Sequence, residues 1–128
     1  MASKTLWGDL GKIEKLKTPK EILREQANFL SEATGHTLQG SVRESVPNRG
    51  GLFYLYLDIV ASALDGYSYE VLAILHGMDL YPLEVHDNVN AKTYNVKDEE
   101  EFIRILEGIL SSPGVHKVIS VLIAQSKA

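Results

Sequence analysis

The chain has 128 residues, a formal net charge of −4 and no cysteine. Its length suits one domain with its own core, because chains of this size bury enough apolar surface to fold without crosslinks. The absence of cysteine excludes disulfides, thiolate nucleophiles and cysteine-ligated zinc, and it fits a reducing compartment. The mildly negative charge argues against nucleic-acid binding, which needs a concentrated basic surface.

No segment has the character of a targeting or membrane-spanning sequence. The N-terminus lacks the continuous apolar stretch of a signal peptide. The longest apolar run, Val118 to Ala124, is interrupted by Ser120 and is too short to cross a bilayer. We therefore expect a soluble, cytoplasmic protein that has no membrane partner.

An N-terminal arm, residues 1–17, is predicted to precede a single domain, residues 18–128. Gly8 and Gly11 disfavour a long helix in the arm. Its apolar residues are spread among lysines: Leu6, Trp7, Leu10, Ile13 and Leu16. Such an arm either packs over its own domain or reaches a partner, with Trp7 as its anchor.

Three helices are predicted, one before and two after a sheet. The first starts at the Thr-Pro pair 18–19, which supplies a cap and a proline at the first helical position, and it ends near Gly35. The second follows Asp98 and has three glutamates in its first turn, where negative charge is favourable. The third runs from Ser112 to about Gln125.

The segment between the helices, His36 to His86, is typical of a four-stranded antiparallel meander. Asp65-Gly66 and Met78-Asp79 are predicted as two-residue turns, and residues 47–51 as a hairpin loop. Lys92 to Val96 could add a brief edge strand. The predicted fold is therefore α+β, with the N-terminal helix and the two C-terminal helices packed on one face of the sheet.

The two turns set a register that sorts the strand side chains onto two faces. The aliphatic face is predicted to lie under the helices and consists of Phe53, Leu55, Leu57, Ile59, Ala61, Leu72, Ile74, Leu83 and Val85. The opposite face is aromatic and partly charged, and we place the candidate binding residues there. They are Arg43, Tyr54, Tyr56, Asp58, Tyr69, Glu84 and His86.

Specific pairs follow from this register. Arg43 lies opposite Tyr56, and Ala73 lies opposite Asp58. Ile74 lies opposite Leu57 on one neighbouring strand and Leu83 on the other. Asp58 and Glu84 fall on one row of the second face, two strands apart and therefore roughly 9–10 Å from each other.

Tyrosine together with arginine is typical of protein interfaces, and soluble monomers seldom leave so large an apolar area bare. The leading hypothesis is a non-enzymatic interaction module that forms a homodimer through the tyrosine-rich face or binds another protein there. One alternative is a small-ligand binding or sequestering protein, whose pocket at a dimer seam is lined by Arg43, the tyrosines and His86. A second alternative is a small hydrolase that uses Asp58, Glu84 and His86.

The sequence contains no motif that favours catalysis. GxSxG, HExxH and the dinucleotide fingerprint are absent, and the loop 47–51 lacks the Lys-Ser/Thr of a phosphate-binding loop. His36 and His116 lack a second ligand at metal spacing, and His76 is expected to pair with Tyr81 at the rim of the core. We therefore predict no catalytic residue, no cofactor and no metal site, and no motif assigns the chain to a family.

Overall fold

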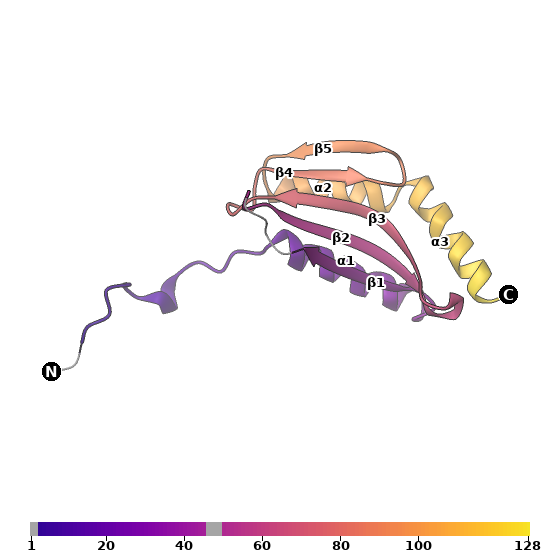
Figure 1. Cartoon of the computed structure of the whole chain (residues 1–128), viewed down its shortest axis with the longest axis horizontal. Coiled ribbons are helices and arrows are strands. Elements are labelled where there is room, and N and C mark those ends of the chain that lie inside the picture. The colour runs from indigo at the N-terminus through magenta and orange to yellow at the C-terminus, as the bar shows by residue number, and fades with distance from the viewer. Residues whose placement is uncertain (1–2, 46–49) are drawn as a thin grey trace.

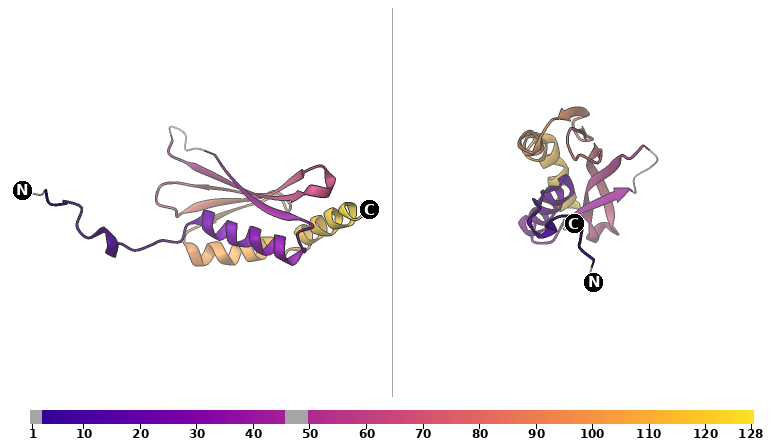
Figure 2. Two further views of the ribbon diagram at one scale, coloured as in Figure 1. Left: turned by 90° about the horizontal axis from the view of Figure 1, so that it is seen from below. Right: turned by 90° about the vertical axis from the view of Figure 1, so that its left-hand side faces the viewer.

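The fold is a two-layer α+β arrangement in which helices cover one face of an antiparallel sheet (Figures 1 and 2). A computed structural model describes residues 3–45 and 50–128. In chain order its elements are the 3₁₀ turn η1 (Leu10–Lys12), α1 (Pro19–Ala33), β1 (Gln39–Ser45), β2 (Phe53–Ala61), the 3₁₀ turn η2 (Ser62–Leu64), β3 (Tyr67–His76), β4 (Leu83–Asp87), β5 (Lys92–Val96), α2 (Glu99–Leu110) and α3 (Pro113–Ser126). Pro47 to Arg49 of the predicted loop lie outside the described residues.

The predicted fold class is confirmed, with one more strand than expected. The described residues form a five-stranded sheet in the order β1-β2-β3-β4-β5, where the sequence predicted four strands. The fifth strand is the short edge segment 92–96, which pairs with β4 along its whole length, from Asp87 opposite Lys92 to Leu83 opposite Val96. The helix arrangement is as predicted, with one helix before the sheet and two after it.

The helices begin where their capping residues predicted. The side chains of Thr18, Asp98 and Ser112 each accept a hydrogen bond from the backbone N–H three residues later, at 3.2, 2.9 and 3.3 Å. Each bond satisfies an N–H that has no partner within the helix. Within the described residues, no single helix is long and apolar enough to cross a membrane, and α2 and α3 reach that length only as a pair bent by 52°.

The register of the first strand pair is as predicted, whereas the predicted turn at Asp65-Gly66 is wrong. Arg43 lies opposite Tyr56 in β1 and β2. The chain between β2 and β3 closes through η2, after which Asp65 adopts a left-handed conformation with φ of 59°. Beside this longer connection the register is shifted by three residues, and beyond a bulge in β3 the shift is two, so Leu55 rather than Leu57 lies opposite Ile74. The shift of two keeps the side chains beyond the bulge on their predicted faces.

A bulge in β3 corrects the prediction for Tyr69. The ladder pairs Leu57 with Leu72 but the next residue, Asp58, with Glu70, so Val71 is the extra residue. The extra residue reverses the faces along the rest of β3. Tyr69 consequently lies opposite the buried Ile59 on the helix side. It does not join the other tyrosines of the open face.

The turn between β3 and β4 is also longer than predicted. Val85, not Leu83, lies opposite Ile74. The predicted core face is nevertheless buried except at Phe53, whose ring stacks on the buried His76 with the ring centroids 5.0 Å apart. His76 Nδ1 donates to the Gly77 carbonyl at 2.8 Å, so the predicted pairing of His76 with Tyr81 is wrong.

Tyr81 instead packs edge-on against Phe102, with the ring centroids 6.4 Å apart. Its buried hydroxyl has no hydrogen-bond partner among the described residues. Burial, followed by the nearby Glu99 and Asp98, raises the pKa of Tyr81 to about 12. The folded protein therefore holds this proton more tightly than the unfolded chain, in which a tyrosine pKa is about 10.

This difference predicts a loss of stability in alkali. The contribution of Tyr81 to the free energy of unfolding should be fully present below pH ~10, and it should be lost as the pH rises from ~10 to ~12. Tyr81→Phe should remove that part of the pH dependence and should be nearly neutral at pH 7, because it deletes an unpaired hydroxyl. Urea unfolding of both proteins at each pH measures the effect. Equal alkaline losses in the two proteins would assign the titration to another group.

The N-terminal arm does not pack over its own domain. Residues 3–17 run away from the two layers (Figure 1), and the side chains of Leu6 and Trp7 are 93% and 80% exposed. The sequence left open whether the arm covers its own domain or reaches a partner. The large apolar side chains of the arm are exposed and do not cover the domain, and Lys17 at its end pairs with Glu25 of α1.

Candidate interaction surface on the open sheet face

Arg43, on the edge strand β1, reaches across the sheet face that the helices leave open. Its guanidinium binds both carboxylate oxygens of Asp58 on the neighbouring strand, through Nε to Oδ2 and through Nη2 to Oδ1 at 3.1 Å. Nη2 also donates to Glu70 Oε1 on β3 at 3.0 Å. One cation thus joins three strands. We call Arg43, Asp58 and Glu70 the arginine clamp.

The arginine clamp gives the buried carboxylate of Asp58 a positively charged partner. Asp58 is only 3% exposed, and a carboxylate removed from water requires a charged or hydrogen-bonding partner. The hydrogen bond to Asp58 is the largest cause that raises the pKa of Arg43 above its ordinary value. Glu70 is held in turn by the side-chain amide of Asn88, which donates to Oε2. The guanidinium is therefore fixed in position and in charge.

Glu70 was missed by sequence reasoning, which placed Ala73 opposite Asp58. The bulge at Val71 brings Glu70 to that position. The register prediction assumed a regular ladder between the strands and therefore did not include this bulge.

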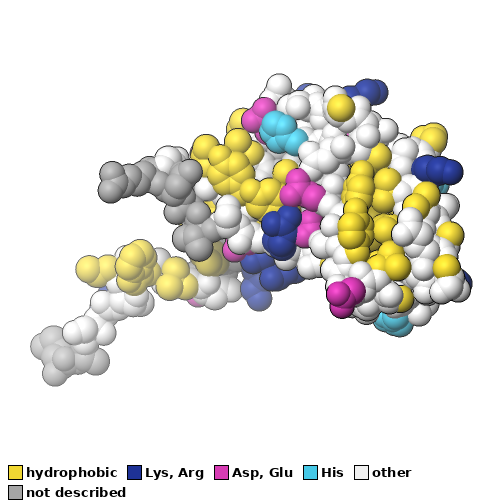
Figure 3. All heavy atoms as spheres, turned by 45° about the vertical axis from the view of Figure 1, so that its right-hand side comes forward, with side chains coloured by type: hydrophobic (Ala, Val, Ile, Leu, Met, Phe, Trp, Pro, Cys, Tyr) yellow, Lys and Arg dark blue, Asp and Glu magenta, His cyan; other side chains and the backbone are white. Residues whose placement is uncertain are grey.

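Tyr56 lies directly under the clamp. The guanidinium carbon of Arg43 is 4.5 Å from the centroid of the Tyr56 ring, which is the geometry of a cation–π contact. Tyr54, two residues earlier on β2, lies opposite Leu75 on β3 and extends the apolar area along the strand. Both tyrosines are half-buried. In Figure 3 the basic and acidic side chains of this face meet between apolar areas.

Glu84 and His86 lie on β4, away from the clamp. His86 Nε2 is 3.8 Å from Glu84 Oε1, and His86 Nδ1 is 3.3 Å from the Thr93 hydroxyl. Glu84 lies opposite Leu75, whereas Asp58 lies opposite Glu70, so the predicted common row of Asp58 and Glu84 is wrong. The three residues of the hydrolase hypothesis are not gathered at one place, and Asp58 is already bound by Arg43.

Three hollows of the described surface each have helix residues in their lining, and none of the three includes Arg43, Tyr54, Tyr56 or His86. Tyr69 lines one of them with α3, on the helix side. In the described part of the chain, no three His, Asp or Glu side chains are grouped so that they could hold a metal ion.

The open face therefore presents a fixed cation, two tyrosines and the neighbouring Leu75. Such a surface can bind a flat, complementary surface rather than enclose a small molecule. Comparison of the chain with protein-family models, with curated proteins and with solved structures finds no match. The chemistry of the surface must therefore carry the functional argument.

Proposed function

We propose that this protein is a non-enzymatic interaction module of the cytoplasm that forms a homodimer through its open sheet face. The observation that carries the proposal is Arg43, held by Asp58 and Glu70 over the ring of Tyr56 on a face that no helix covers. Arginine and tyrosine are the residue types that dominate binding energy at protein interfaces.

Preorganisation strengthens the proposal. A long side chain that is ordered only on binding costs about 0.5–1.5 kcal/mol. The ion pairs and the ring contact already hold Arg43 in the free protein. A partner surface that accepts the guanidinium and the tyrosine rings avoids most of that cost, which favours a binding role over a purely structural one.

The alternatives are less well supported by the same geometry. The ligand-sequestering hypothesis needs a pocket lined by Arg43 and His86, and these residues line none of the three hollows. The hydrolase hypothesis needs an acid or base at Asp58, whose two oxygens are engaged by Arg43. A second copy of the chain is the simplest partner, because in an isologous dimer the same surface patch of each subunit contacts that of the other.

The proposal predicts different results for two tyrosines. Tyr54→Ala should weaken self-association at least about tenfold, because it removes an aromatic contact from the open face. Tyr67→Ala is the matched control, since Tyr67 is 51% exposed and pairs with Ala61 of the core face. Light scattering over a concentration series that reaches tens of micromolar, where an interface of standard size persists, measures both variants. A wild-type monomer in that range, or equal losses in both variants, would overturn the proposal.

A further inference from the structure

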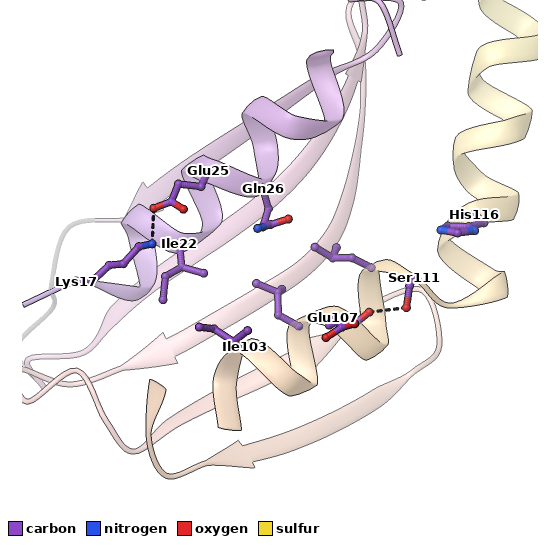
Figure 4. A pocket seen from close by; sticks show the side chains of 10 residues that line it. Lys17, Ile22, Glu25, Gln26, Ile103, Glu107, Ser111 and His116 are labelled. Atoms are coloured by element: carbon purple, nitrogen blue, oxygen red, sulfur yellow. Dashed lines mark hydrogen bonds and ion pairs between the residues drawn. The ribbon is translucent and has the colours of Figure 1, made fainter. Parts of the chain in front are cut away.

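Two hollows, of about 460 and about 230 Å³, lie in the helical layer between α1 on one side and α2 and α3 on the other. Figure 4 shows the side chains that line the larger one. Gln26 of α1 and Leu110 of α2 line both hollows, so the two adjoin at these residues. We call the two hollows together the helix groove.

The inner part of the helix groove is apolar. Its floor is the core face of the sheet, at Leu57, Ile59 and Val71. Phe29 on α1 and Ile103 on α2 line the groove and are 59% and 46% exposed. Such side chains are the usual lining of a site that receives apolar groups.

The outer end of the helix groove is partly acidic. Glu25 on α1 and Glu107 on α2 lie on its two walls (Figure 4). Lys17, the last residue of the arm, lines the same end and forms an ion pair with Glu25 at 2.6 Å. The carboxylate of Glu25 at this end of the groove therefore binds a lysine of the arm.

The arm is complementary to the groove in both respects. Five large apolar side chains of the arm are more than half exposed: Leu6, Trp7, Leu10, Ile13 and Leu16. Residues 1–17 contain four lysines, Asp9 and Glu14, a formal charge of +2, which leaves −6 for the rest of a chain whose total is −4. A basic, apolar segment and an acidic, apolar groove thus belong to the same molecule.

We infer that the helix groove holds the N-terminal arm of a second copy of this chain. The start of α1 favours a second copy over the same copy. Thr18 is extended, with φ of −85° and ψ of 157°, its hydroxyl is engaged as the helix cap, and Pro19 keeps it extended. Beyond Lys17, which touches the end of its own groove, the arm therefore continues away from the domain instead of folding back along that groove (Figure 1).

The inference rests on the proposed homodimer and names a second contact within it. Two sheets packed through their open faces place the helical layers about 30 Å apart, counting about 10 Å for each layer-to-layer step. A 15-residue arm extends up to about 50 Å at ~3.3 Å per residue, so its N-terminal half, which includes Leu6 and Trp7, spans more than this separation. That half of each arm can therefore reach the partner's groove, and the reciprocal exchange closes the dimer.

Trp7 provides a direct readout, because it is the only tryptophan in the chain. Docking moves its indole from water into an apolar groove, so its fluorescence emission should shift to the blue. The shift should be present at about 50 µM full-length protein and should be lost on dilution to about 50 nM, because it depends on a second copy.

Two variants that keep Trp7 identify the contact. Leu6→Ser weakens the arm at a residue that can reach the partner, and Phe29→Glu with Ile103→Glu blocks the groove. Each should abolish the blue shift and weaken dimerisation at least about tenfold. A 1:1 mixture of the two should recover part of the blue shift, because one intact arm then meets one intact groove. Met78→Glu, at an apolar position that is 84% exposed on the β3–β4 loop, is the control and should change nothing.

The outcomes separate this inference from the proposed dimer. A blue-shifted emission at every concentration means docking within one chain and overturns the inference. An emission typical of water at every concentration, with a dimer still seen by light scattering, overturns the inference and leaves the open-face dimer standing. Failure of both signals overturns both. If the groove variant does not fold, the arm variant still decides, because its substitution lies outside the folded domain.

Discussion

Leu57→Ala should lower the free energy of unfolding by about 2–5 kcal/mol, the range expected when a buried leucine is truncated. Leu57 is 5% exposed and lies under the helices. Its neighbour Tyr56 points to the open face, so Tyr56→Ala should leave most of the stability in place. It should instead weaken self-association by about 2 kcal/mol, the usual loss for a central aromatic contact.

Urea unfolding and light scattering of both variants test the separation. Tyr56→Ala keeps the hydrogen bonds between Arg43 and Asp58. Because the buried carboxylate remains paired, we expect the variant to stay folded. A Tyr56→Ala protein that unfolds while Leu57→Ala is benign would mean that the faces are inverted. If both variants unfold, both faces of the sheet are covered within one chain, and the open-face proposal is lost.

Local chemistry in the sequence predicted most of the fold correctly. A cap such as Thr18 acts on an N–H three residues away, so the start of a helix can be predicted from a short window. The Arg43–Tyr56 pair and the aliphatic face of β2 follow from the two-residue period of a strand. These features need no knowledge of distant parts of the chain.

The errors arose where tertiary packing overrides the local pattern. Asp65-Gly66 has the composition of a tight turn, yet the chain uses the preceding residues in a 3₁₀ turn. Val71 and Leu72 are adjacent and both belong to the apolar core, whereas a regular strand sends neighbouring side chains to opposite faces. The bulge resolves that conflict, and it also moves Tyr69 away from the site and brings Glu70 to Asp58.

The helix groove was not predictable for a related reason. The periodicity of α1 and α2 shows which residues face the sheet, but it does not show how far apart the two helices lie. That separation depends on where each helix is seated on the sheet, and for α1 the position is set at Gly40.

Gly40→Ala should be among the most destabilising single substitutions in the chain. A Cβ at Gly40 would lie 2.4 Å from Ala27 Cα and 2.5 Å from the Ala27 carbonyl oxygen, both backbone atoms of α1. The Gly40 N–H also donates to the Ser31 hydroxyl at 3.1 Å, which ties the same strand to the same helix. Relief requires α1 to move off β1, so we expect a loss of about 3 kcal/mol, at the upper end of the usual cost of overpacking.

Gly108→Ala is the matched control, because the substitution is identical but the surroundings differ. A Cβ at Gly108 would meet nothing within 4 Å, and the residue is exposed in the interior of α2. Alanine should therefore stabilise the protein by about 1 kcal/mol through its higher helix propensity. Urea midpoints at an unchanged slope measure both effects. A neutral Gly40→Ala would show that α1 is not seated on β1 at this residue, and the wall of the helix groove that α1 forms would then lose its anchor point.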